Sequence, residues 1–114
     1  MQVIGVPVQN ESQATFVVGA LEDAIAAKRV ELKDVAYVSK EADGKVKVHQ
    51  TRFKAHFWDT GIKDKVMKSF GTDLPEGHGI VFALGDEQAI AGIADRIDQL
   101  TDGNTTPIRF DVDD

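Results

Sequence analysis

One stretch of the sequence limits the fold more than any other: residues 34–51, DVAYVSKEADGKVKVHQT. Two runs of residues that favour strands, 35–41 and 45–51, are separated by Ala42-Asp43-Gly44. An aspartate followed by a glycine between two such runs is a strong signal for a β-hairpin. The sequence therefore predicts two neighbouring antiparallel strands joined by a tight turn.

Two registers of this hairpin compete. A two-residue loop would set Lys40 opposite Lys47, and like charges that face each other across a strand pair are unfavourable. That loop would also divide the apolar residues between the two faces of the hairpin. A three-residue loop with Gly44 in the left-handed conformation avoids both problems, so we expect it. The pairs that it predicts are Glu41 with Lys45 and Val38 with Val48.

In this register, the two faces of the hairpin differ in polarity. One face carries small and branched apolar side chains, namely Ala36, Val38, Val46 and Val48. The other face is polar except for its aromatic ring, and it carries Tyr37, Ser39, Lys47 and His49. We expect this second face to look toward solvent or toward a partner subunit.

The length and composition indicate a single soluble domain over residues 1–114. A chain of this length buries roughly 65% of its unfolded surface and folds without covalent links. The sequence has no cysteine, which excludes disulfides, thiol chemistry and cysteine-based zinc sites. Residues 1–5 show no basic region followed by a long apolar stretch, so we expect no signal peptide. Apolar runs such as 80–84 are shorter than the roughly 18 residues of a membrane span. We expect a cytoplasmic protein without a membrane span.

The net charge of −6 is concentrated near the carboxyl terminus. Residues 1–85 contain 11 basic and 11 acidic residues, whereas residues 86–114 contain 2 basic and 8 acidic residues. An acidic surface repels phosphate backbones, so the sequence argues against nucleic acid as the main partner.

The other segments alternate between strand and helix patterns. Strands are expected over 2–8, 80–84 and 107–112, and the unbroken apolar run of 80–84 indicates a central strand covered on both faces. Helices are expected from a cap at Asn10 or Ser12 to near Arg29, over 61–70 with Gly71 as the stop, and from a cap at Asp86 to Asp102-Gly103.

The resulting order is β-α-β-β-α-β followed by α-β. Its first six elements match the split βαβ, or ferredoxin-like, arrangement, so we predict an α+β fold of this kind with an added α-β unit. Such a sheet carries its helices on one face, and the strands would offer the other face Val3, Tyr37 and either Phe82 or Val81. A partly apolar open face normally has a partner, so we expect a homodimer through it. The alternative is a monomer in which the added unit or residues 51–60 cover that face.

The chain also resembles a bacterial family called domain of unknown function 1269, whose members are often labelled predicted membrane proteins. The resemblance covers nearly the full length. It rests on the opening strand and helix, Glu41-Ala42-Asp43-Gly44-Lys45-Val46-Lys47, Gly61-Ile62, and Leu74-Pro75-Glu76-Gly77 before the apolar strand. Family members usually carry a long apolar hairpin rich in glycine and alanine between the hairpin and the second helix, and this chain has only residues 52–60 there. The resemblance therefore implies the soluble framework without the membrane-seeking insert, and it implies no catalytic residue.

Residues 52–60, RFKAHFWDT, have an unusual composition. The aromatic residues Phe53, Phe57 and Trp58 are interleaved with Arg52, Lys54 and His56. One interpretation is a binding edge for a ligand, a peptide or single-stranded nucleic acid. The other is that the rings fill the core or a dimer interface in place of the missing insert. The acidic charge elsewhere and the lack of an aromatic RNA-binding strand motif disfavour nucleic acid.

The three histidines, His49, His56 and His78, show no spacing typical of a metal site, and we expect neither a metal nor a cofactor. Because no catalytic constellation is present, the first hypothesis is a non-enzymatic, self-associating module that binds a protein partner or a small ligand. The second is a small enzyme or ligand sensor of the dimeric α+β-barrel kind, with a pocket between sheet and helices near Tyr37 and His49. Ligand or partner contacts are expected at Tyr37, His49, Phe53, His56, Phe57 and Trp58.

Overall fold

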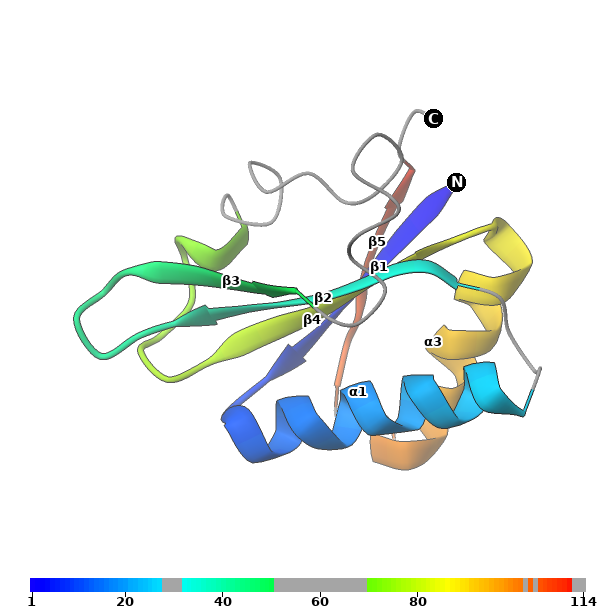
Figure 1. The fold of residues 1–114 in the computed structure, drawn as a ribbon, viewed down its shortest axis with the longest axis horizontal. Helices are drawn as coiled ribbons and strands as arrows, with labels where there is room; N and C mark the ends of the chain where they lie inside the picture. The colour runs from blue at the N-terminus through cyan, green and yellow to red at the C-terminus, as the bar shows by residue number, and fades with distance from the viewer. Residues whose placement is uncertain (28–31, 51–69, 102, 104, 112–114) are drawn as a thin grey trace.

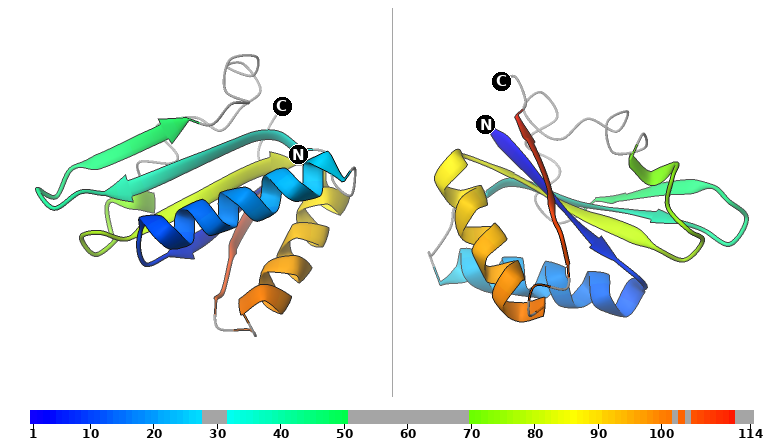
Figure 2. Two further views of the ribbon diagram at one scale, coloured as in Figure 1. Left: turned by 60° about the horizontal axis from the view of Figure 1, so that its bottom comes forward. Right: turned by 180° about the vertical axis from the view of Figure 1, so that it is seen from behind.

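The fold is α+β, and the described part of the chain forms a five-stranded antiparallel sheet with helices α1 and α3 packed on one of its faces (Figures 1 and 2). The computed structural model describes residues 1–27, 32–50, 70–101, 103 and 105–111. Its strands are β1 (Gln2–Val8), β2 (Leu32–Lys40), β3 (Val46–Gln50), β4 (Gly79–Gly85) and β5 (Ile108–Asp111). Its helices are α1 (Glu11–Ala26) and α3 (Glu87–Thr101).

The strand order is β3-β2-β4-β1-β5, and every neighbouring pair is antiparallel. Helix α1 links β1 to β2 with β4 between them, and α3 links β4 to β5 with β1 between them. The predicted α+β class and the predicted central strand over 80–84 are both confirmed, since all seven residues of β4 are buried.

The roles of the individual strands differ from the prediction. The sequence assignment counted β3 among the six elements of the split βαβ unit and treated the last helix and strand as an addition. In the structure β3 lies at one edge beside β2, while β5 pairs with β1. The physical reason is that β4 is apolar on both faces, so it takes the central position next to both β1 and β2.

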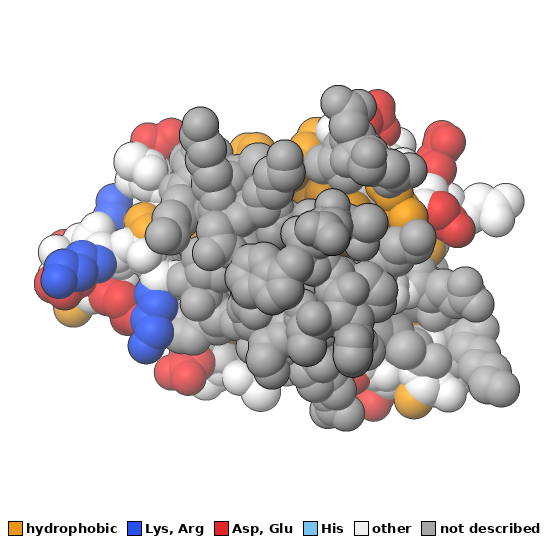
Figure 3. Space-filling view, turned by 45° about the horizontal axis from the view of Figure 1, so that its top comes forward, with side chains coloured by type: hydrophobic (Ala, Val, Ile, Leu, Met, Phe, Trp, Pro, Cys, Tyr) orange, Lys and Arg blue, Asp and Glu red, His pale blue; other side chains and the backbone are white. Residues whose placement is uncertain are grey.

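The hairpin has the predicted three-residue loop. Val38 pairs with Val48, and the backbone N–H of Glu41 donates to the carbonyl oxygen of Lys45 at 2.8 Å. Gly44 has a φ of 84°, a conformation that glycine adopts without strain. The exposed end of the hairpin carries both basic and acidic side chains, and both kinds lie at the left margin of the face in Figure 3.

The predicted helix caps are also found. The side-chain oxygen of Asn10 accepts a hydrogen bond from the N–H of Gln13 at 2.9 Å, and that of Asp86 accepts one from Ala89 at 2.8 Å. Asn10, and not Ser12, is therefore the cap of α1. The predicted end of this helix near Arg29 lies outside the described residues. So does the helix predicted over 61–70, apart from Phe70, which is helical together with Gly71.

The face assignment of Tyr37 from the sequence was wrong. Tyr37 and Val81 pack on the helix side of the sheet, against Val35 and Ala83, whereas Phe82 lies on the opposite side with Val38. The alternation along β2 was correct, but alternation alone does not say which face the helices cover. The sequence prediction placed the more polar face of the hairpin toward solvent or a partner. In the structure Ser39 on that face is only 7% exposed, because it lies beneath α1 and the loop before β4.

The helix-free face is not open at its centre. Val3, Phe82 and Leu84 are each 0% exposed within a single chain. The ring of Phe70 lies 5.9 Å from that of Phe82 and 5.4 Å from that of Phe110, measured between ring centroids. Burial within one chain removes the observation from which a dimer through this face was expected.

The close fit of Tyr37 over β4 predicts that Gly79 tolerates no side chain. A Cβ atom at residue 79 would overlap the Tyr37 ring and lie 2.6 Å from the carbonyl oxygen of Val38. We expect Gly79→Ala to lower the free energy of unfolding by about 1–3 kcal/mol in a urea titration. The matched control is Gly19→Ala, where a Cβ atom meets nothing within 4 Å and the helix gains about 0.5–1 kcal/mol. Equal effects of the two substitutions would contradict the placement of Tyr37.

Candidate functional site

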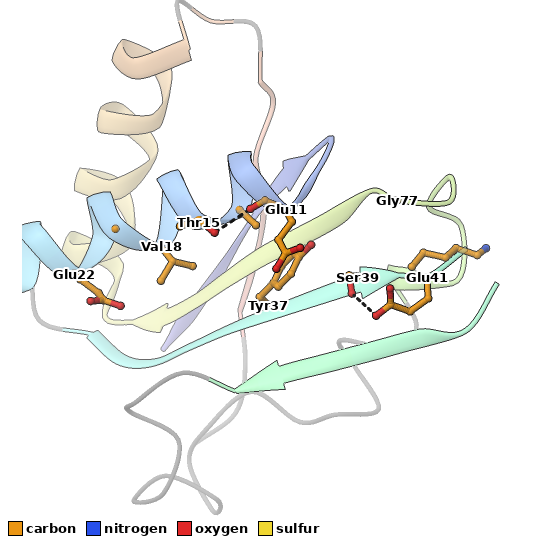
Figure 4. Close-up of a pocket in the computed structure, with 11 residues that line it drawn as sticks. Glu11, Thr15, Val18, Glu22, Tyr37, Ser39, Glu41 and Gly77 are labelled. Atoms are coloured by element: carbon orange, nitrogen blue, oxygen red, sulfur yellow. Dashed lines mark hydrogen bonds between the residues drawn. The ribbon is translucent and has the colours of Figure 1, made fainter. Parts of the chain in front are cut away.

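An open cavity of about 680 Å³ lies between one flank of α1 and the end of β2 that leads into the hairpin (Figure 4). Its volume lies in the range of about 300–1,000 Å³ that is typical of small-molecule sites. The lining residues come from α1, from β2 and from the loop before β4. They are Glu11, Ala14, Thr15, Val18, Gly19, Glu22, Tyr37, Ser39, Lys40, Glu41 and Gly77.

Two sequence periodicities bring these side chains together. On α1, Glu11, Thr15 and Glu22 recur at spacings of four and seven, so they share the helix flank that faces β2. On β2 and directly after it, Tyr37, Ser39 and Glu41 alternate and therefore point to the same face of the sheet. Figure 4 shows the side chains of Glu11 and Glu22 reaching from α1 toward this strand.

The loop before β4 closes one end of the cavity. The N–H of Gly77 donates to the carbonyl oxygen of Lys40 at 2.8 Å, and the N–H of Lys40 donates to the carbonyl oxygen of His78 at 2.9 Å. These bonds extend the pairing of β2 to residues 77 and 78, which directly precede β4. Gly77 has a φ of 82°, which lets the loop turn at this point.

A short chain of hydroxyl and carboxylate groups crosses the floor of the cavity. The side chain of Ser39 forms a hydrogen bond with the hydroxyl of Tyr37, and its Oγ donates to Oε1 of Glu41 at 3.5 Å. The Tyr37 ring lies close over Gly79, which has no side chain to displace it. The phenol is therefore held in place at both its ring and its hydroxyl.

The surroundings of Tyr37 favour its neutral form. Burial raises the pKa of the Tyr37 hydroxyl above its ordinary value of 10.0, because the phenolate would lose hydration. The hydrogen bond with Ser39 acts in the opposite direction and lowers this pKa. The negative charges of Glu11 and Glu41 raise it further.

The cavity carries an excess of negative charge. Three carboxylates line it, those of Glu11, Glu22 and Glu41, against one ammonium group, that of Lys40. The Nζ atom of Lys40 donates to the carbonyl oxygen of Thr72 at 2.7 Å, which ties this cation to the loop after Gly71. The arrangement is suited to bind positively charged groups.

The residues expected from sequence to make contacts are placed as follows. Tyr37 lines the cavity, and His49 pairs with it across the backbones of β2 and β3. The side chain of His49 lies outside the described part of the structure, as do Phe53, His56, Phe57 and Trp58. Five other residues of the cavity lining were not predicted as site residues, although the first three share a helical spacing in the sequence: Glu11, Thr15, Glu22, Ser39 and Glu41.

Among residues 1–27, 32–50, 70–101 and the described residues beyond them, no three histidine, aspartate or glutamate side chains lie together as a metal ion requires. No helix in the described part of the chain is long and apolar enough to cross a membrane. Comparisons with protein-family models, with curated proteins and with solved structures give no match.

Titration of the phenol tests the geometry of the cavity. Tyr37 is the one tyrosine in the sequence, so the ultraviolet absorbance of the phenolate reports this residue alone. We expect its midpoint to lie above that of the urea-unfolded chain. Glu11→Gln should lower the midpoint by removing a negative charge, and Ser39→Ala should raise it by removing the hydrogen bond that stabilises the phenolate. Glu87→Gln on α3 is the control and should leave the midpoint unchanged.

The raised pKa of Tyr37 also affects the free energy of unfolding at high pH. The folded-state pKa of Tyr37 is raised, so above about pH 10 the unfolded chain loses this proton while the folded chain still holds it. The free energy of unfolding should therefore fall as the pH rises through the folded-state pKa. Tyr37→Phe should remove this component of the fall. An unchanged slope in the variant, measured by urea titration at several pH values, would contradict the partial burial of the phenol.

Proposed function

We propose that this protein is a non-enzymatic binding module whose ligand is a small organic cation held in the Tyr37 cavity. One observation carries the proposal: three carboxylates and a fixed phenol line one cavity of ligand size. Ammonium groups form charge-assisted hydrogen bonds with carboxylates. They are also attracted to aromatic rings, and Tyr37 is among the residues that line the cavity.

The spread of the carboxylates favours an elongated ligand with more than one charge. Glu11 and Glu22 are eleven residues apart on α1, which corresponds to about 16 Å along the helix axis. Between them the cavity wall is formed by Thr15, Val18 and Gly19, which are small or apolar and suit a methylene chain. A linear polyamine fits this pattern of alternating charge and hydrocarbon, whereas a short diamine reaches only part of it.

We further propose that the sheet belongs to the ferredoxin-like class. The units β1-α1-β2 and β4-α3-β5 interleave in the order β2-β4-β1-β5, and this supports the proposal. In this interpretation β3 is the added element, placed outside β2 by the hairpin. The resemblance to the domain of unknown function 1269 family is likewise a proposal, supported by the hairpin and by the turn that leads from Leu74 to Gly77.

A second candidate function, a small enzyme or ligand sensor, uses the same cavity. The chain of contacts from Tyr37 through Ser39 to Glu41 supports it, because a phenol held protonated and oriented is able to donate a proton to a bound molecule. The two candidates differ in the fate of the ligand. A binding module returns the amine unchanged, and Tyr37→Phe keeps most of the affinity because the ring remains. In an enzyme the amine is converted, and Tyr37→Phe stops the conversion.

Calorimetric titration with butylamine, putrescine and spermidine tests the proposal. We expect affinity to increase with each added ammonium group by roughly twofold to fivefold, the range of a solvent-exposed ion pair. Glu11→Gln combined with Glu22→Gln should abolish this increase. Glu87→Gln is the control, because it removes one acidic charge from α3 and leaves the cavity unaltered.

Two results would overturn the cavity assignment. One is the absence of heat and of a thermal shift with all three amines. The other is an equal loss of affinity in the Glu87→Gln control, which would mean that only the overall charge matters. Mass spectrometry of the recovered amine then separates the binding module from the enzyme.

A further inference from the structure

A second recessed surface lies on the other flank of α1, where this helix faces α3. Two adjoining cavities of about 240 and 200 Å³ share Ile97 and Leu100 as lining residues. Together they form a groove between the two helices, which lie on the same face of the sheet (Figure 2). We refer to this surface as the α1–α3 groove.

The groove is apolar at its floor and shallow-walled. Leu21, Ile93 and Ile97 form the floor, and all three are buried in the helix-side core. The walls include Ala20, Ala24 and Gly92, which carry a methyl group or no side chain and so leave the space between the helices unfilled. An inserted side chain would therefore meet the core directly.

Two large hydrophobic side chains stand exposed at the rim. Phe16 is 61% exposed and Leu100 is 42% exposed, and both line the smaller cavity. Among the residues that the structure describes, these two are the exposed large hydrophobics. Exposed apolar groups gathered at one groove mark an interaction surface more often than scattered ones do.

The charge of the helix layer limits what can occupy this groove. Residues 11–27 and 86–101 contain seven acidic residues and one basic residue, Arg96. Of these, Asp95 and Arg96 line the groove itself, and Asp23 is exposed next to Ala24. Asp98 is also exposed directly after Ile97 and adds acidic charge beside the groove, whereas Glu11 and Glu22 line the Tyr37 cavity on the other flank of α1. A second copy of this chain would bring an equally negative layer against the first.

We propose that the α1–α3 groove docks a basic amphipathic helix of a partner protein. The apolar side chains of that helix enter the groove at spacings of three and four, between Phe16 and Leu100, and its lysine or arginine residues face the acidic helix layer. This surface is separate from the Tyr37 cavity, because the two lie on opposite flanks of α1.

Fluorescence anisotropy with a designed peptide tests this proposal. The probe is a labelled four-turn peptide with leucine at i, i+3, i+4 and i+7 and lysine at the other positions. A second probe carries glutamate in place of lysine. We expect the lysine peptide to bind the wild-type chain, with affinity that falls as salt is raised, and the glutamate peptide not to bind.

Substitutions at the rim separate docking from simple charge attraction. Phe16→Ser combined with Leu100→Ser should weaken the lysine peptide roughly tenfold or more, since aromatic and aliphatic anchors dominate such interfaces. The matched control is Thr15→Ala, which alters the neighbouring position on the opposite flank of α1. If the double variant does not fold, Phe16→Ser alone serves, because most of that side chain is already in solvent.

Three outcomes would overturn the proposal. The first is no binding of the lysine peptide to the wild-type chain. The second is equal binding to the wild type and the rim variant, which would show attraction by charge alone. The third is a wild-type dimer in sedimentation that the rim variant converts to monomer, which would make a second copy the occupant of the groove.

Discussion

The structure depends on the burial of β4 on both faces. All seven residues of this strand are buried, and they pair with β1 on one side and β2 on the other. Because β1 and β2 run antiparallel to β4, they are parallel to each other, and the connection between them has to cross β4. Helix α1 makes this crossing, and its amino-terminal half therefore lies over the end of β2 that enters the hairpin. The Tyr37 cavity follows from that crossing, since it lies where the helix flank meets the strand.

The two flanks of α1 have different surroundings for the same reason. One flank faces the end of β2 near the hairpin, where Tyr37 and Ser39 carry hydroxyl groups, and the space there is also lined by carboxylates. The other flank faces α3, and the space between the helices is apolar at its floor. Leu21, Ala14 and Val17 anchor the helix between these two spaces by packing on the sheet. The proposed ligand site and the proposed docking groove therefore share one structural element without sharing a surface.

Local chemistry explains what the sequence could predict. The turn at Asp43-Gly44 and the caps of α1 and α3 depend on residues within a few positions, and all three are found, with Asn10 as the cap of α1 out of the two candidates. The strand order and the face of Tyr37 depend on long-range choices: which strand takes the centre, and on which side the helices pack. Predicting the cavity would have required both the strand order and the face that the helices cover. Its α1 stripe of Glu11, Thr15 and Glu22 was visible in the sequence, but nothing local indicated that it meets Tyr37.

Amide hydrogen exchange measured by NMR tests the central role of β4 most directly. If the fold is organised around this strand, the amides of Gly79–Gly85 should exchange only through global unfolding. The amides of β3 and β5, at the edges of the sheet, should exchange through smaller local openings. Amides of β4 that exchange as readily as those of the edge strands would contradict this account of the fold.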